Sequence, residues 1–174
     1  MSLLSKVKVI KGDITTLKVD AICNTTNKRM LAGGSGVNEA VHRAAGKELQ
    51  AECSTLNGCT TGEAKITKGY NLPARYVIHT VGPPFVSETL LASCYSTSLN
   101  LIKSKGLRSI AFPCISTGLD GDFPNKKAAS VAFRVVMSWL NEHSDHVDEI
   151  IFCTYLPHDY QFYNDLIRDY SEAS

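Results

Sequence analysis

Residues 31–42, LAGGSGVNEAVH, join a glycine-rich loop to the start of a segment with helical periodicity. Glycines let backbone N–H groups approach a ligand closely, and the N-terminus of a helix adds unpaired N–H donors and partial positive charge. The combination predicts a cradle for a small anion, with Asn38 as the first polar side chain after it. A flexible surface turn is the alternative interpretation.

A second loop of the same design spans residues 115–125, ISTGLDGDFPN. It follows the strand pattern SIAFPC and meets a helical segment with Pro124 in its first turn, a position that suits proline. Two such loops at one edge of a sheet could hold two linked phosphates, which one loop alone would not suggest. The sequence therefore indicates a diphosphate ligand.

The common nucleotide-binding signatures do not occur in the chain. After Gly34 and Gly36, Glu39 stands where the third glycine of GxGxxG belongs, and the sequence contains no GK[ST] of a phosphate-binding P-loop. A standard dinucleotide or ATP site is therefore disfavoured.

Two further residues could complete a nucleotide pocket, since Asp13 follows the first expected strand and Tyr155 ends the last one. A carboxylate can accept a hydrogen bond from an exocyclic amine, and an aromatic face can stack on a base. Each residue has a simpler interpretation. Asp13 before Ile14 also suits a turn, and a tyrosine at a strand end is commonly part of the core.

The elements that must position these residues alternate along the whole chain. We expect strands over residues 7–12, 19–24, 62–69, 75–82, 108–116 and 147–155, and helices over 36–56, 88–106, 124–143 and 159–170. This interleaving predicts an α/β fold, with a mixed, mostly parallel sheet covered by helices on both faces. Ligands of such sheets bind at the carboxyl ends of the strands, where both glycine loops are expected.

Length and composition fit one domain over residues 1–174. The net charge is +1 with scattered basic residues, so we expect neither nucleic acid nor a membrane as a partner. Six cysteines without a CxxC pair, mostly in apolar runs, indicate reduced and buried thiols. The first ten residues carry no signal-peptide pattern, and no apolar stretch approaches the roughly 20 residues of a membrane span. These features favour the cytoplasm or the nucleus.

With these residues assembled, the chain resembles a macrodomain, most closely the MacroD-type subfamily. The matching segments are GDIT, VDAICNTTN, GVNEAVHRAAG, GCTTGEAKITKGYNLPARYVIHTVGP and FPCISTG, in the order and spacing of the family over nearly the whole chain. The resemblance implies a three-layer α/β/α sandwich that binds ADP-ribose, free or attached to protein, in a cleft over the sheet. It implies no cofactor or metal, and we expect a monomer.

The resemblance also assigns roles to residues. Adenine would lie between Asp13 and Tyr155, the diphosphate between the backbones of residues 33–37 and 116–121, and the distal ribose at Asn27. Catalytic candidates are Asn27, Asn38 and His42. The full set of expected ligand-binding residues is Asp13, Ile14, Asn24, Asn27, Gly33, Gly34, Ser35, Gly36, Val37, Ser116, Thr117, Gly118, Leu119, Asp120, Gly121, Phe123 and Tyr155.

The chain departs from the family pattern in both loops. The asparagine motif reads NTTN where NAAN is usual, and each glycine loop is one residue longer than usual. Asp120 stands where relatives carry an aromatic residue. Because a carboxylate near a diphosphate is repelled, we expect Asp120 to point to solvent and Phe123 to cover the distal ribose.

MacroD-type relatives commonly hydrolyse mono-ADP-ribosyl esters and O-acetyl-ADP-ribose, with an aspartate four residues before a histidine. Here the matching residues are Asn38 and His42. A carboxamide has negligible basicity near neutral pH, so we expect an ADP-ribose reader whose hydrolysis is weakened or lost. The alternative is an active hydrolase, with Glu39 or the phosphate of the substrate as the base. Glu39 lies about 100° further round the helix, and His42 could equally be a structural residue.

Two remaining groups of side chains receive structural interpretations. We expect His79 to be structural, and His143, His146 and His158 to be solvated. A third class of function, a cysteine-nucleophile enzyme, would depend on Cys114 before the second glycine loop. That cysteine lies in an apolar strand, where thiols are usually inert.

Overall fold

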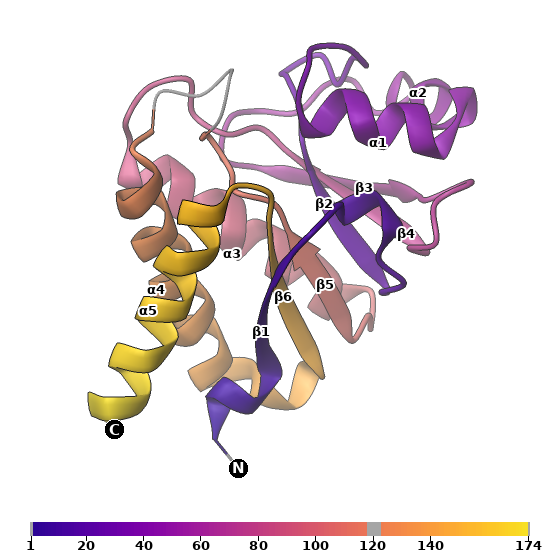
Figure 1. Ribbon diagram of the computed structural model, residues 1–174. Coiled ribbons are helices and arrows are strands. Elements are labelled where there is room, and N and C mark those ends of the chain that lie inside the picture. Colours follow the sequence, from indigo (N-terminus) through magenta and orange to yellow (C-terminus); the bar gives the residue numbers. More distant parts are fainter. Residues whose placement is uncertain (1, 118–122, 174) are drawn as a thin grey trace.

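A computed structural model describes residues 2–117 and 123–173. Within these ranges the centre of the molecule is one six-stranded sheet in the order β1-β6-β5-β2-β4-β3 (Figure 1). All neighbouring pairs run parallel except β3 and β4, which are antiparallel. The mixed, mostly parallel sheet expected from the sequence is confirmed. Its strands are β1 (Val7–Lys11), β2 (Ala21–Thr25), β3 (Ala64–Lys68), β4 (Tyr76–Thr80), β5 (Ser109–Phe112) and β6 (Glu149–Thr154).

Helices cover both faces of the sheet (Figure 1). Successive strand residues point to opposite faces, so Ile110 and Phe112 pack in one apolar cluster and Ala111 in the other. The first cluster contains residues of α3 (Glu88–Ser104), α4 (Asn125–His143) and α5 (Pro157–Ala173), and the second contains residues of α1 (Val37–Ala45) and α2 (Lys47–Cys53). The expected three-layer α/β/α sandwich is therefore confirmed. Short 3-10 helices span Leu3–Lys6, Ile14–Thr16 and Ser144–His146.

The prediction of a single helix over residues 36–56 is wrong, because the helix is interrupted at Gly46. Gly46 has φ +93°, a left-handed conformation that glycine adopts without strain, and its N–H caps α1 by donating to the carbonyl of His42. A Cβ at this position would also lie 2.9 Å from Nδ2 of Asn71. The chain therefore turns there, and α2 begins at Lys47.

Other boundaries shift by a few residues. The strand expected to reach residue 116 ends at Phe112, because Pro113 has no N–H to continue the ladder. Pro124 precedes α4 instead of lying in its first turn, and α5 begins at Pro157, two residues earlier than expected. Among the helices of the described ranges, none is both long and apolar enough to cross a membrane.

Candidate functional site

The two glycine loops leave the sheet from neighbouring strands, β2 and β5. The chain after β2 continues into α1 on one face of the sheet, whereas the chain after β5 continues into α4 on the other face (Figure 1). Connections that diverge in this way open a crevice at the carboxyl ends of the two strands, and open α/β sheets bind their ligands there. The topology thus places both loops at one sheet edge, as the sequence predicted.

The first glycine loop presents its backbone to the solvent. Gly33 and Gly34 have φ +141° and +83°, and an added Cβ at Gly33 or Gly36 would meet no atom within 4 Å. Gly36 is the N-cap of α1 and makes no side-chain cap, so the N–H groups of the first turn have no side-chain acceptor. Ser35 is exposed and Val37 half-buried at this point. Open backbone and uncapped helical donors suit an anionic ligand.

Side chains on both sides hold this loop. Asn27 forms a reciprocal pair with Leu31, donating to its carbonyl at 2.9 Å and accepting from its N–H at 3.1 Å. From α2, Gln50 accepts from the N–H of Ala32 and donates to the carbonyl of Met30 at 3.2 Å. Sequence reasoning did not identify Gln50, and no local pattern marks it, because its partners Met30 and Ala32 lie 20 and 18 residues away along the chain.

Asn38 lies at the start of α1 and bonds with both ends of its carboxamide. Its Oδ1 accepts from Nδ2 of the buried Asn24 at 2.9 Å, and its Nδ2 donates to the carbonyls of Leu31 at 2.9 Å and Gly33 at 3.3 Å. Asn24, the second-last residue of β2, also contacts Nδ1 of His79 at 3.2 Å. The residue expected to replace a catalytic acid therefore lies between the sheet and the glycine loop.

His79 continues this chain of contacts into the core. Its Nε2 lies 2.9 Å from Oγ1 of Thr67 on β3 and 3.7 Å from Sγ of Cys53 on α2. Burial, with a smaller contribution from nearby His42, lowers the pKa of His79 to about 3. The expectation of a structural histidine fits, and this ring is neutral at physiological pH.

His42 faces the sheet one turn after Asn38. Its ring centroid lies 6.3 Å from that of His79, it is 8% exposed, and burial lowers its pKa. Neither of its ring nitrogens has a hydrogen-bond partner within the described part of the chain. Glu39 points elsewhere, because both of its carboxylate oxygens accept from Nη1 of Arg43, at 2.6 and 2.7 Å.

Buried polar atoms without partners lie on or next to β2 and on α1. In residues 2–117 and 123–173, the buried side-chain N and O atoms that lack a hydrogen bond belong to Asn24, Thr26 and His42. Such atoms cost roughly 1–3 kcal/mol each unless a water or a ligand satisfies them. Their concentration between β2 and α1 marks the same site as the glycine loop.

The second loop is held at its base. Ser116, with φ +64°, donates from its hydroxyl to the carbonyl of Pro83 at 3.1 Å, and its backbone carbonyl accepts from the N–H of Phe123 at 3.1 Å. Thr117 donates to the carbonyl of Cys114. A Cβ on Gly82 would lie 2.3 Å from Oγ of Ser116, so only glycine admits this close approach. The expected ligand-binding residues Gly118, Leu119, Asp120 and Gly121 lie outside the described residues.

Phe123 is 2% exposed and belongs to the apolar cluster on the α3, α4 and α5 side of the sheet. Its role as a cover for the distal ribose remains a prediction. In this conformation the ring is part of the core.

The adenine-side residues lie at the ends of neighbouring strands. Lys11 of β1 pairs with Thr154 of β6, and the N–H of Gly12 donates to the carbonyl of Thr154 at 2.9 Å. Tyr155, the next residue, is 83% exposed, so its interpretation as a core residue is wrong. Asp13 is exposed and caps a 3-10 turn through Oδ1, which accepts from the N–H and the hydroxyl of Thr15. Ile14 is buried beneath this turn.

The cysteines offer no activated nucleophile. All six are free, and Cys114 is the least buried of them. Burial, followed by the negative charge of Asp159, raises the pKa of the Cys114 thiol far above its ordinary value. The prediction of mostly buried thiols is confirmed, and thiolate chemistry at Cys114 is disfavoured.

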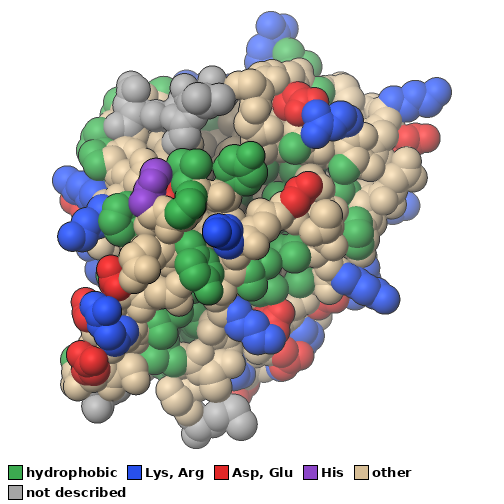
Figure 2. Space-filling view, viewed as in Figure 1, with side chains coloured by type: hydrophobic (Ala, Val, Ile, Leu, Met, Phe, Trp, Pro, Cys, Tyr) green, Lys and Arg blue, Asp and Glu red, His purple; other side chains and the backbone are tan. Residues whose placement is uncertain are grey.

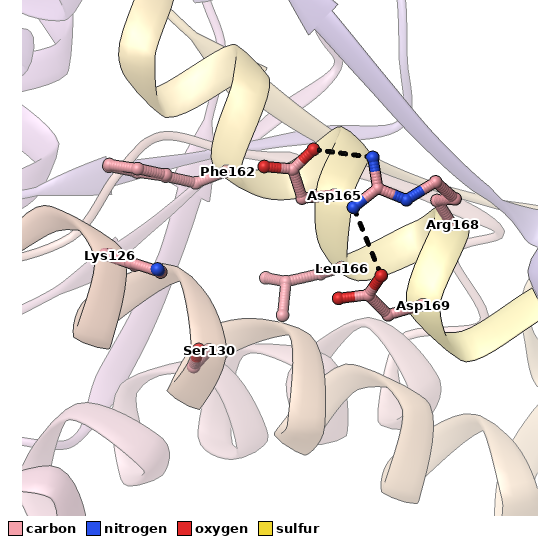
Figure 3. A pocket seen from close by; sticks show the side chains of 7 residues that line it. All are labelled: Lys126, Ser130, Phe162, Asp165, Leu166, Arg168 and Asp169. Carbon is pink, nitrogen blue, oxygen red and sulfur yellow. Dashed lines mark hydrogen bonds and ion pairs between the residues drawn. The ribbon is translucent and has the colours of Figure 1, made fainter. Parts of the chain in front are cut away.

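The surface offers two further features for comparison. On the face drawn in Figure 2, acidic and basic side chains are interspersed, so no patch of a single sign marks it. A groove of about 240 Å³ lies between α4 and α5, where Arg168 pairs with Asp165 and Asp169 at 3.2 Å each (Figure 3). Because Arg168 is shared between two carboxylates, the groove matches a diphosphate less well than the glycine loop does. Its walls are Lys126, Ser130, Phe162, Asp165, Leu166, Arg168 and Asp169.

Comparison with known proteins agrees with the motifs quoted from the sequence. A family model described as Macro domain matches residues 23–132. ADP-ribose glycohydrolase MACROD2 of Homo sapiens is 50% identical over 175 residues, covering 97% of this chain and 41% of that protein. The Macro domain-containing protein RSc0334 of Ralstonia nicotianae is 48% identical, covering 94% of this chain and 95% of that protein. The chain spans less than half the length of the MACROD2 proteins that it matches.

Solved structures agree with the architecture. The Trypanosoma brucei macrodomain in complex with ADP-ribose superposes with a TM-score of 0.92 at 43% identity, covering 95% of this chain and 70% of that one. The Oceanobacillus iheyensis macrodomain with ADP superposes with a TM-score of 0.87 at 36% identity, covering 95% and 92%. The resemblance inferred from the sequence motifs is confirmed.

Proposed function

The chain belongs to the Macro domain family, and from that premise we propose that it binds ADP-ribose, free or attached to protein, in the crevice between the loops after β2 and β5. The observation that carries the proposal is the open glycine backbone of residues 33–36 beside the uncapped start of α1, at the point where the sheet connections diverge. A solved relative from Trypanosoma brucei, similar over 95% of this chain, is described as a complex with ADP-ribose.

In this proposal each part of the ligand meets a matching group. The diphosphate accepts from backbone N–H groups of the first loop and of the second loop after Ser116. The adenine stacks on the exposed ring of Tyr155, and Asp13 accepts from its exocyclic amine with the carboxylate oxygen that does not cap Thr15. The distal ribose lies toward Asn27, at the entrance to the loop.

We propose further that hydrolysis is weakened, because Asn38 supplies no carboxylate to activate water. The neighbouring groups do not replace it. Glu39 is paired with Arg43, and His42 has a lowered pKa and no acidic partner among the described residues. The second candidate function is an active ADP-ribosyl ester hydrolase, and the 50% identity to proteins named ADP-ribose glycohydrolase favours it.

The two candidates separate in one experiment. A protein carrying mono-ADP-ribose on acidic side chains is incubated with this chain, and loss of the label is followed over time, while calorimetry with free ADP-ribose measures binding. Micromolar binding, about −8 kcal/mol, with slow or no loss of label supports the reader. Rapid release establishes the hydrolase, and absence of binding contradicts both.

A further inference from the structure

Both functional groups of the Asn38 carboxamide, its oxygen and its NH₂, make hydrogen bonds. Backbone carbonyl oxygens only accept hydrogen bonds, so the atom that faces Leu31 and Gly33 must be the NH₂ group of Asn38. Its oxygen then faces the buried Asn24 and accepts from the NH₂ of that residue at 2.9 Å. The loop carbonyls thus determine the orientation of both amides.

The donor and acceptor of each hydrogen bond can be assigned in the same way from Asn24 into the sheet. Because Asn24 presents its NH₂, Nδ1 of His79 must accept, and the proton of the neutral ring lies on Nε2. That N–H donates to Oγ1 of Thr67, whose own proton goes to the carbonyl of Lys68 at 3.1 Å. Every donor in the series meets an acceptor, from β3 through β4 and β2 to the glycine loop.

We propose that Asn38 is a positioning residue that fastens the glycine loop to the sheet through the series Thr67, His79, Asn24 and Asn38. Both functional groups of its carboxamide are required, one for the sheet and one for the loop. Its consequence for ligand affinity rests on the proposed function, because a fastened loop holds its backbone N–H groups ready for the diphosphate.

An aspartate at position 38 has the same shape but cannot do both tasks. One carboxylate oxygen still accepts from Asn24, whereas the other faces two carbonyl oxygens with no proton to donate. Two hydrogen bonds are replaced by repulsion between like partial charges. Substitution by aspartate therefore releases the loop while the rest of the domain stays folded.

Amide hydrogen exchange in the unliganded protein tests this proposal. In Asn38→Asp, the amides of Leu31 and Ala32 are expected to exchange about tenfold faster or more, relative to the amides of β6 in the same sample. Asn141→Asp, the same substitution on the exposed side of α4, is the matched control and leaves the loop rates unchanged. Equal rates in the Asn38→Asp variant and the wild type, or acceleration shared equally by β6, would overturn the proposal.

A second variant tests transmission through the sheet and carries the test if Asn38→Asp does not fold. Thr67→Val keeps the shape of the side chain and removes the acceptor for Nε2–H of His79. We expect faster exchange at Leu31 and Ala32, by a smaller factor than in Asn38→Asp. Unchanged exchange rates at Leu31 and Ala32 in Thr67→Val would confine the effect to Asn38. That result would contradict transmission from Thr67 through His79 and Asn24.

Titration with ADP-ribose tests whether the attachment of the loop to the sheet affects ligand affinity. We expect the Kd of Asn38→Asp to rise about tenfold, as the loop must be ordered at the expense of binding free energy. Since the exchange measurements use no ligand, a wild type that binds no ADP-ribose contradicts the proposed function alone. A released loop with unchanged Kd contradicts the positioning role.

Discussion

Asn24 and His79 are direct register partners on the parallel strands β2 and β4, and Nδ2 of Asn24 lies 3.2 Å from Nδ1 of His79. A fully buried amide and a fully buried imidazole are thereby joined directly behind the glycine loop. Because the imidazole accepts this bond, its neutral form is part of the folded state. A proton on Nδ1 would face the NH₂ of Asn24.

The lowered pKa of His79 predicts that the free energy of unfolding decreases as the pH falls from about 6.5 towards 3. In that window the unfolded chain binds a proton that the folded chain excludes, so the loss reaches about 1.4 kcal/mol per pH unit. The lowered pKa of His42 acts in the same direction. Urea unfolding near pH 7 and near pH 5 measures the slope, and His79→Gln should reduce it.

The exposed His146 supplies the control for this measurement. His146→Gln is expected to retain the acid sensitivity of the wild type. If His79→Gln shows the same slope as His146→Gln, the buried ring is not the source of that sensitivity.

The sequence predicts the layers and the loops of this protein, because those depend on local pattern. Short runs rich in β-branched residues identify the strands, and glycines after strands identify both glycine loops. The break at Gly46 is not local information, since a glycine within a helical pattern is often tolerated and only the packed α1 and α2 show that its φ is positive. Likewise, the double use of the carboxamide of Asn38 depends on carbonyls and on a strand partner that meet only in three dimensions.

Asp13 caps a 3-10 turn with Oδ1, which accepts from Thr15. We expect the charge of the same carboxylate to bind the exocyclic amine of adenine. Asp13→Ala removes both, whereas Asp13→Asn keeps the cap, because asparagine caps about as well as aspartate. Calorimetry with ADP-ribose should show at least about a tenfold higher Kd for both variants, since a charge-assisted hydrogen bond contributes roughly 1.5–3 kcal/mol. If the Kd rises in Asp13→Ala but not in Asp13→Asn, Asp13 supports binding through the turn that it caps and not through its charge.

Tyr155 is expected to be a stacking platform, because 83% of it is exposed at the end of β6. Tyr155→Ala should raise the Kd for ADP-ribose at least about fivefold, since stacking on a base contributes roughly 1–3 kcal/mol, and Tyr155→Phe should retain most of the affinity. Tyr160→Ala on α5 removes a tyrosine that is 38% exposed and serves as the control. Equal Kd values for the two alanine variants would exclude Tyr155 from the site.

Phe123 is buried in the core, so Phe123→Ala should lower the free energy of unfolding by about 3–5 kcal/mol in urea. Phe85→Ala, at a position that is 57% exposed, should change it by about 0.5 kcal/mol or less. Phe123→Leu keeps apolar volume and tests the predicted cover over the ribose. If this variant is stable and binds ADP-ribose as the wild type does, Phe123 is a core residue only.

Asn38→Asp is expected to separate chemistry from positioning in the kinetics of ADP-ribosyl ester cleavage. The new carboxylate can activate water, so kcat should rise about a hundredfold, which lies within the usual range for a general base. The released loop should raise KM about tenfold, because the interactions of Asn38 with Leu31 and Gly33 are lost in substrate binding. Initial rates on a mono-ADP-ribosylated protein measure both constants.

Asn38→Ala is the control, with the same rise in KM and no gain in kcat. If the wild type is already as fast as the aspartate variant, the base is Glu39 or a phosphate of the substrate, and the carboxamide at position 38 serves the loop alone.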